Sequence, residues 1–222
     1  MTKTFSGDPA NRLKGDPDFF LREIRGVIHV GANVGEERKR YVIHRLNVVW
    51  IEPNPEVFDL LKGRIAPFSN QKAFKYLVTD VDDKEYPFHI SSNAGSSSSI
   101  YDFAAHREIW PDVTFIKTIT LRSITLSSLI KKERLDLAHY DALVLDTQGS
   151  ELLVLKGAIN LLPHIKYVKT EVADFESYAG GCRLSDMDDF LQAHGFRRVA
   201  ARIFAYKIGL GSYYDVLYAS LS

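Results

Sequence analysis

Cysteine is nearly absent from this sequence, and its opposite charges cancel. Cys182 is the only cysteine among the 222 residues, which excludes an internal disulfide and a zinc site built from several cysteines. The 28 Lys and Arg residues equal the 28 Asp and Glu residues, so the chain as a whole lacks the basic field that attracts nucleic acid. Sparse cysteine is typical of a reducing compartment.

Long apolar runs are absent as well. The longest, such as Ala142–Leu145, are far shorter than the roughly 20 residues that a membrane-spanning helix needs. The polar start, residues 1–18, has neither the apolar stretch of a secretory signal nor the many basic residues of a transit peptide. With 45% hydrophobic and 25% charged residues, the composition is globular. We therefore expect a soluble, cytoplasmic protein with no membrane or nucleic-acid partner.

Short apolar segments alternate with helical stretches over most of the chain. Their continuous apolar character, rich in branched side chains, is typical of strands that are buried on both faces of a parallel sheet. Five such strands are expected: Val27–Val30, Asn47–Ile51, Phe74–Thr79, Asp141–Leu145 and Lys166–Val172.

Helices are predicted between these strands, and a hairpin after them. The segments Arg197–Tyr206 and Tyr213–Ser220, joined by a turn that contains glycine, predict an antiparallel pair. The sequence signals for the helices are an N-cap and first-turn pair at Asn54 and Pro55, an apolar spacing from Leu152 to Leu162 that Pro163 stops, and a capping-box variant at Ser185 and Asp188 before a stop at Gly195.

The pattern breaks down between Asp80 and Thr125. Tyr86–Ile90 and Thr114–Leu121 are candidate strands, and Asn93–Ser99 is a loop that could serve as a lid or as a plain linker. We expect an N-terminal extension with a lead-in helix over residues 1–26. A single domain over residues 27–222 follows, with an insertion at about 82–124 over the sheet edge.

A glycine loop follows the first expected strand, and the next helix is expected to begin near Glu36. Gly31, Asn33 and Gly35 allow the backbone to turn sharply and to approach a ligand closely. Glu52 ends the second strand about 20 residues later, where an acid can bind both hydroxyls of a ribose.

Two further acids end the next strands at the same edge. Asp80 follows the third strand and Asp146 the fourth, and ligands of open α/β sheets bind at the carboxyl ends of the strands. Each piece alone has a structural interpretation: the glycine loop as an ordinary turn, Asp146 as a helix cap and Glu52 as a solvated loop residue. The joint order of strand, glycine loop, helix, strand and acid favours a nucleoside-binding site.

The loop chemistry restricts the ligand. A dinucleotide fingerprint has a third glycine at the position of Glu36, and a carboxylate there repels a pyrophosphate. No Gly-Lys-Ser/Thr sequence of a nucleotide-triphosphate loop occurs either. A ligand with ribose and adenine but no phosphate fits better, and S-adenosylmethionine, whose sulfonium and amino groups are cationic, is the expected cofactor.

The sequence resembles the FkbM-type methyltransferases, a branch of the class I S-adenosylmethionine-dependent superfamily. The resemblance covers roughly Val27 to Val172, and its most specific motif is the last one. The matching motifs are His29-Val-Gly-Ala-Asn-Val-Gly35, Ile51-Glu-Pro-Asn-Pro55, Asn93-Ala-Gly-Ser-Ser-Ser98, Ile124-Thr-Leu-Ser-Ser-Leu129 and Leu145-Asp-Thr-Gln-Gly-Ser-Glu-Leu-Leu-Val-Leu-Lys-Gly157.

The resemblance implies an α/β, Rossmann-like fold: a mostly parallel seven-stranded sheet that ends in a C-terminal antiparallel hairpin. It also implies a set of cofactor-binding residues, with Glu52 on the ribose, and Asp80 and Val81 at the adenine. His29 stands where many members have an acid, Gln148 where Glu is usual and Ser127 where Asp is common. The implied cofactor residues are His29, Gly31, Asn33, Gly35, Glu52, Pro53, Asp80, Val81 and Asp146.

The candidate catalytic residues are three acids. An alcohol acceptor must lose its proton, and Asp146 is the first candidate base because it lies at the crevice. Glu151, one turn into the next helix, and Glu171, on the fifth strand, follow it. The competing interpretation of these two is a buried ion pair, with Lys156 and Lys169 as partners. The histidines are scattered without ligand spacing, so no metal is expected.

The family implies methyl transfer to a hydroxyl oxygen of a sugar or small natural-product-like acceptor. Two alternatives remain: a non-catalytic module that binds S-adenosylmethionine or a nucleotide, and an NAD-dependent oxidoreductase, which Glu36 and the lack of a Tyr-x-x-x-Lys motif disfavour. Aromatic residues of the insertion could stack on an acceptor, pack the insertion onto the sheet or serve a homodimer contact. Arg107 and Arg122 are candidate partners of an acidic acceptor.

Overall fold

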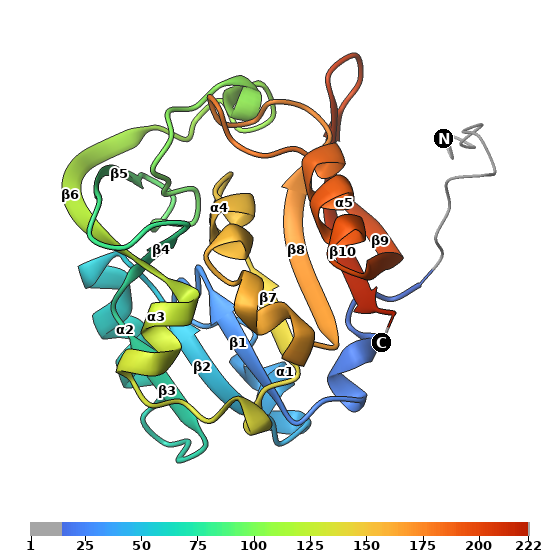
Figure 1. The fold of residues 1–222 in the computed structure, drawn as a ribbon. Helices are drawn as coiled ribbons and strands as arrows, with labels where there is room; N and C mark the ends of the chain where they lie inside the picture. The colour runs from blue at the N-terminus through green and yellow to red at the C-terminus, as the bar shows by residue number, and fades with distance from the viewer. Residues whose placement is uncertain (1–14, 222) are drawn as a thin grey trace.

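The structure is a computed structural model that describes residues 15–221 (Figure 1). Most of the expected N-terminal extension, residues 1–14, lies outside the described residues. The rest of it contains η2 (Phe19–Arg22), a short 3₁₀ helix whose Phe20 and Leu21 are buried in the core.

A seven-stranded sheet forms the centre of the fold, as predicted. β1, β2, β3, β7 and β8 run parallel, whereas β10 is antiparallel to both β8 and β9. The terminal hairpin is therefore the reversed pair that the sequence predicts. In spatial order the strands are β3 (Gln71–Phe74), β2 (Asn47–Ile51), β1 (Gly26–Val30), β7 (Ala142–Leu145), β8 (Tyr167–Ala173), β10 (Gly211–Ser220) and β9 (Phe196–Lys207).

Helices cover both faces of this sheet. Neighbouring residues of a strand enter different apolar clusters, as Val27 and Ile28 do, because successive side chains point to opposite faces. One cluster is closed by η2, α1 and α2, and the other by α3, α4, η5 and α5. The helices are α1 (Arg38–Ile43), α2 (Pro55–Ile65), η3 (Ala105–Glu108), α3 (Leu126–Lys132), η4 (Leu137–His139), α4 (Glu151–Lys156), η5 (Ile159–His164) and α5 (Leu184–Ala193).

The prediction of a single strand over Phe74–Thr79 is wrong. The strand of the main sheet ends at Phe74, and Leu77–Thr79 form β4 of a second, three-stranded sheet. In that sheet β6 (Phe115–Thr125) lies between β4 and β5 (Glu85–Ser91), parallel to β4 and antiparallel to β5. Backbone pairing with β6 thus draws the chain away from β2 at Lys75. The second sheet curves along one side of the molecule (Figure 1).

Two helices also begin or end differently from the sequence prediction. α1 begins at Arg38 rather than near Glu36, because Gly35 and Arg38 close turns with backbone bonds to Ala32 and Gly35. The helix expected as far as Pro163 ends as α4 before Gly157. The carbonyl of Gly157 accepts from both the N–H and the hydroxyl of Ser127, and the chain continues as the 3₁₀ helix η5.

The start of α5 also differs. Asp186 accepts the backbone N–H of Arg183 at 2.7 Å, and this contact replaces the predicted pair of Ser185 and Asp188. Asp188 instead accepts a hydrogen bond from the hydroxyl of Tyr218. Two of the helix signals are confirmed: the Asn54 side chain caps α2, and Gly195, at φ +82°, follows the end of α5.

Candidate functional site

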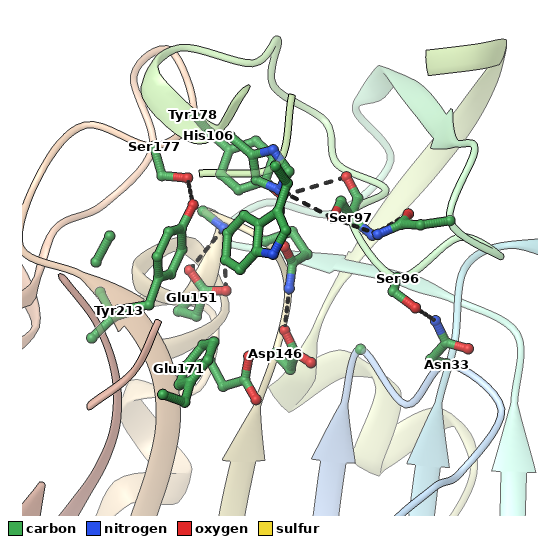
Figure 2. Close-up of a pocket in the computed structure, with 18 of the residues that line it drawn as sticks. Asn33, Ser96, Ser97, His106, Asp146, Glu151, Glu171, Ser177, Tyr178 and Tyr213 are labelled. Atoms are coloured by element: carbon green, nitrogen blue, oxygen red, sulfur yellow. Dashed lines mark hydrogen bonds between the residues drawn. The ribbon is translucent and has the colours of Figure 1, made fainter. Parts of the chain in front are cut away.

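Two adjoining cavities lie at the carboxyl ends of β1, β2, β7 and β8. The larger measures about 320 Å³ and the smaller about 40 Å³. They meet at five residues from the loops after β1 and β7 and from the insertion, some of which are labelled in Figure 2. These shared residues are Gly31, Asn33, Ser96, Asp146 and Gln148.

The glycine loop after β1 lies close against the chain after β7 because Gly31 has no side chain. A Cβ at Gly31 would lie 1.8 Å from the backbone oxygen of Asp146, and the residue has φ +81°, a conformation that favours glycine. Asn33 and Gly35 also have positive φ, of +44° and +70°. The resulting turn directs the backbone N–H of Asn33 toward Glu52.

Glu52 is a buried carboxylate held by the backbone. One of its oxygens accepts the N–H of Asn33 at 2.8 Å, and the other accepts the N–H of Asn54 at 2.8 Å. Burial raises the pKa of Glu52 to about 7, although both hydrogen bonds lower it. Each oxygen retains acceptor capacity toward the smaller cavity, which Glu52 and Pro53 line. The side chain can therefore accept two ligand hydroxyls.

The remaining wall of the smaller cavity is partly apolar and partly polar. Apolar side chains of β4, β5 and the insertion form one part, and hydroxyl groups from the Asn93–Ser99 loop and from the loop after β7 form another; the apolar residues are Leu77, Val78, Phe88 and Ile100. Apolar side chains and hydrogen-bonding groups beside a buried carboxylate suit a flat heteroaromatic ring joined to a diol.

Asp80 and Val81 do not join the other predicted cofactor residues. Both are exposed, and neither lines either cavity. The cause is the strand break after Phe74. The prediction placed Asp80 after a third strand of the main sheet, but that strand ends at Phe74, and Leu77 and Val78 belong to β4 of the second sheet. Gly35 does not line the cavities either, since the space beside its Cα is filled by Leu61 of α2.

Asp146 lies at the boundary between the two cavities. Its carboxylate accepts a 2.5 Å hydrogen bond from the side-chain amide of Gln148, and the hydroxyl of Tyr178 donates to the carbonyl oxygen of the same amide at 2.5 Å. Burial, with the charges of Glu171 and Glu151, raises the pKa of Asp146 well above its ordinary value. Asp146 does not cap α4, so the helix-cap interpretation is wrong.

Glu151 holds the loop that carries Gln148. Its carboxylate accepts the backbone N–H groups of Thr147 at 2.7 Å and of Gly149 at 3.0 Å, and the thiol of Cys182 at 3.2 Å. Within residues 15–221 it forms no ion pair, and Lys156 is exposed, so the ion-pair interpretation is wrong for this residue.

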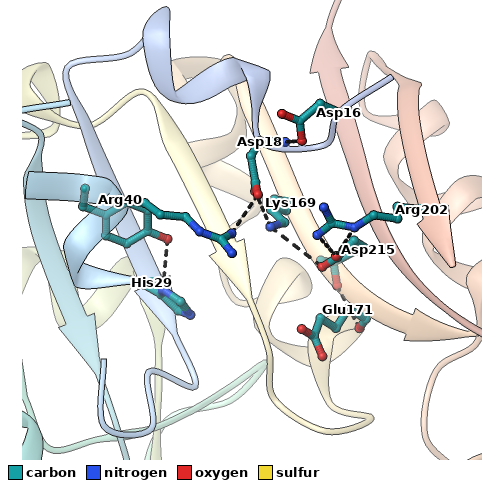
Figure 3. Close-up of polar contacts among 10 residues, drawn as sticks. Asp16, Asp18, His29, Arg40, Lys169, Glu171, Arg202 and Asp215 are labelled. Carbon is teal, nitrogen blue, oxygen red and sulfur yellow. Dashed lines mark hydrogen bonds and ion pairs between the residues drawn. The ribbon is translucent and has the colours of Figure 1, made fainter. Parts of the chain in front are cut away.

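Glu171 lies on β8, is half-buried and lines the larger cavity. Burial and the charge of Asp215 raise its pKa to about 7, while Lys169 opposes the shift. Lys169 forms its ion pairs with Asp18 at 2.6 Å and with Asp215 at 3.8 Å, so the ion-pair interpretation of Glu171 is also wrong (Figure 3).

His29 lines the larger cavity at the base of the glycine loop. Its Nδ1 lies 3.1 Å from the hydroxyl of Tyr41, and its ring stacks on Trp50 with centroids 5.1 Å apart. Burial lowers the pKa of His29 to about 4, so the ring is neutral at pH 7. At this point the cavity is therefore lined by a neutral imidazole.

Sequence reasoning missed the polar and aromatic side of the larger cavity. Tyr178, Tyr213 and Ser177 line it, and no local motif marks any of them. His106 is also there, with Nε2 bonded to Ser97 at 3.1 Å and Nδ1 without a hydrogen-bond partner. Burial lowers the pKa of His106 to about 4. The serine run of the Asn93–Ser99 loop was a usable signal, because Ser96 and Ser97 reach the cavity.

The described part of the chain lacks two further features. No three or more His, Cys, Asp or Glu side chains are grouped so that they could hold a metal ion. Each helix there is too short or too polar to cross a bilayer.

Comparisons with known proteins identify a family and a fold. A family model described as the methyltransferase FkbM domain matches residues 29–198. No curated protein matches the sequence. Among solved structures, the trans-methyltransferase CalH in complex with SAH is 11% identical with a TM-score of 0.51, and the METTL16 MTase domain is 12% identical with a TM-score of 0.51. The alignments cover 90% of this chain but 52% and 60% of those chains, and at such identities the similarity is one of fold.

Proposed function

The chain belongs to the FkbM family of methyltransferase domains, and from this we propose that it transfers a methyl group from S-adenosylmethionine to a hydroxyl oxygen of a sugar or other small natural-product-like acceptor. The observation that carries the cofactor assignment is the environment of Glu52. Each of its two oxygens accepts one backbone N–H, and the residue lines the smaller cavity, so the carboxylate keeps acceptor capacity for a ribose diol. The solved CalH structure, which has the same fold, contains SAH, the demethylated product of this cofactor.

The charges around the cavities support the same cofactor. Neither cavity is lined by Lys or Arg among the described residues, so a pyrophosphate would find no cationic partner. Glu36 and Glu37 line the larger cavity beside the glycine loop and would repel it. A sulfonium cation and an amino group suit these surroundings. The oxidoreductase alternative is accordingly disfavoured.

Asp146 is the proposed base. When bound, S-adenosylmethionine supplies a methyl group that is activated by its positive sulfur. Asp146 would accept the hydroxyl proton of the acceptor as the acceptor oxygen takes the methyl group and the sulfur keeps the electron pair of the broken carbon–sulfur bond. A raised pKa makes the Asp146 carboxylate a better proton acceptor than an ordinary aspartate. Gln148 orients this carboxylate, and Glu151 holds the backbone of the loop that carries Gln148.

Calorimetric titration of the protein with S-adenosylmethionine, SAH and NAD tests the proposal. We expect binding of the first two and none of NAD. Binding of NAD alone, or of none of the three to folded protein, would overturn it. Transfer of a labelled methyl group to a panel of sugars and natural-product alcohols then separates an enzyme from a non-catalytic binding module, because the module would bind SAH without turnover.

A further inference from the structure

The larger cavity is acidic and partly aromatic. Within the described residues its lining contains five carboxylates and no Lys or Arg. Neither Arg107 nor Arg122, the candidate partners of an acidic acceptor, contributes to it. The carboxylates are those of Glu36, Glu37, Asp146, Glu151 and Glu171, and the aromatic lining residues include Trp110, Tyr178, Phe204 and Tyr213.

Four of these five carboxylates either accept hydrogen bonds within the protein or lie at the proposed position of the cofactor. The carboxylate of Glu151 accepts hydrogen bonds from backbone N–H groups of its own loop, and that of Asp146 accepts one from the side-chain amide of Gln148. Glu36 and Glu37 belong to the glycine loop, where the sulfonium cofactor is proposed to bind. Glu171 differs from all of them: within residues 15–221 its carboxylate forms no hydrogen bond and no ion pair. A half-buried carboxylate without a partner is costly, and a cation beside it would remove the cost.

The sheet order places Glu171 on the acceptor side. Glu52 directly follows β2, Asp146 follows β7, and Glu171 lies on β8, with the strands in the order β2, β1, β7, β8. A cofactor whose ribose is held at Glu52 therefore reaches toward Asp146, and Glu171 lies beyond it. Figure 2 shows Asp146 and Glu171 facing the same open space, below the ring of Tyr213 and the labelled aromatic residues.

A second observation on this side points to a polar ligand. His106 lines the cavity and is 1% exposed, yet its Nδ1 has no hydrogen-bond partner. A ligand that hydrogen-bonds here would satisfy a polar atom that is otherwise unpaired. The neighbouring rings of Trp110 and Tyr213, with centroids 4.7 Å apart, offer faces to a cation or to a sugar ring.

We infer that the acceptor carries a protonated amine that pairs with Glu171, as an amino-substituted sugar or polyol would. This assignment rests on the proposed methyl transfer and narrows its substrate class. The amine binds Glu171 while a neighbouring hydroxyl faces Asp146. Phosphorylated and carboxylated acceptors are rejected, because no cationic side chain in the cavity would offset five carboxylates.

The test begins with SAH, so that failure of the cofactor proposal is recognised first. Sugars are then titrated into the SAH complex in matched sets: free amines, their N-acetylated forms and the corresponding uronic acids, with glucosamine, N-acetylglucosamine and glucuronic acid as one set. We expect at least one amine to bind about tenfold or more tightly than its acetylated form, and no uronic acid to bind. No preference for an amine in any set, or tight binding of an acid, would overturn the inference even if SAH binds normally.

Glu171→Gln supplies the residue-specific test. The variant keeps the shape of the side chain, and unchanged SAH affinity would establish that its fold is intact. We expect it to lose the preference for the amine. Glu85→Gln is the matched control, since Glu85 lies on β5 in an exposed ion pair with Arg122, and it should retain the preference. Retention of the full preference in Glu171→Gln would overturn the assignment.

Discussion

The backbone N–H of Asn33 donates to the carboxylate of Glu52 across 2.8 Å, and this contact joins the glycine loop after β1 to the residue that ends β2. The other oxygen of Glu52 is held by the N–H of Asn54, which is also the N-cap of α2. The carboxylate of Glu52 thus connects the chain after β1 with the chain after β2 before any ligand binds. Such preorganisation lowers the entropic cost of binding.

Glu52→Gln should weaken the binding of SAH. The substitution removes the negative charge that would accept the ribose hydroxyls, and a hydrogen bond to a charged group is worth about 1.5–3 kcal/mol. We expect the Kd to rise roughly tenfold or more, since 1.4 kcal/mol corresponds to a factor of ten. Calorimetry measures it, with Glu56→Gln as the control because Glu56 is a nearby exposed acid in the first turn of α2. Equal affinities in the two variants would contradict the assigned role of Glu52.

The position of Glu52 beside the glycine loop could be predicted because it depends on local order. A glycine loop after one strand and an acid after the next are adjacent in a parallel sheet whichever residues pack around them. The same reasoning failed at Asp80 and Val81, since the strand before them pairs with β6, whose residues follow about 45 positions later. No residue within Phe74–Thr79 indicates the pairing with β6, so the break after Phe74 could not be predicted from this segment alone.

The sequence also could not separate the roles of the acids around the cavity. Glu151 follows one expected strand and Glu171 lies on the next. The carboxylate of Glu151 accepts backbone N–H groups, whereas that of Glu171 has no hydrogen-bond partner among the described residues. The difference arises from the left-handed turn at Gln148 and Gly149, which directs N–H groups toward Glu151. Tyr178 reaches the same turn from a loop 30 residues away.

Glu171→Gln should stabilise the protein at alkaline pH. Because the folded-state pKa of Glu171 is about 7 and its ordinary value is 4.5, the folded protein binds more protons than the unfolded chain between these values. This carboxyl therefore reduces stability as the pH rises from 4.5 to 7, and the reduction is complete above 7. Half-burial limits the effect to about 1–2 kcal/mol.

Urea unfolding at pH 5 and pH 8 measures this effect. The difference in unfolding free energy between Glu171→Gln and the wild type should be small at pH 5 and should favour the variant at pH 8. Glu85→Gln, an exposed position, should show no such change between the two pH values. A variant that is less stable than the wild type at pH 8 would show that Glu171 has a stabilising partner.

Gly31→Ala and Gly63→Ala should have opposite effects on stability. A Cβ at Gly31 would overlap the backbone oxygen of Asp146, at a positive φ, so we expect a loss of about 3 kcal/mol or more. A Cβ at Gly63, in α2, meets nothing within 4 Å, and alanine there should add roughly 0.5–1 kcal/mol. Chemical denaturation of both variants measures the pair. A stable, unperturbed Gly31→Ala would contradict the close approach of β1 and β7.

Tyr178→Phe should slow methyl transfer without weakening SAH binding. The Tyr178 hydroxyl donates to Gln148, whose amide in turn donates to Asp146, so its removal frees the amide that orients the proposed base. One hydrogen bond of this kind is worth about 1–2 kcal/mol, which corresponds to a roughly five- to thirtyfold lower kcat. Because the Tyr178 hydroxyl contacts Gln148 and forms no hydrogen bond with Glu52 or with the glycine loop, the Kd for SAH should stay unchanged.

Steady-state kinetics with the acceptor found in the methyl-transfer panel distinguishes this positioning role from a merely structural one. A structural defect would lower the melting temperature and weaken SAH binding together with turnover, whereas a positioning defect lowers kcat alone. Tyr206→Phe is the matched control, because Tyr206 is exposed on β9 and lines neither cavity. If Tyr178→Phe and Tyr206→Phe turned over at the same rate, the hydrogen-bonded chain from Tyr178 to Asp146 would have no part in the reaction.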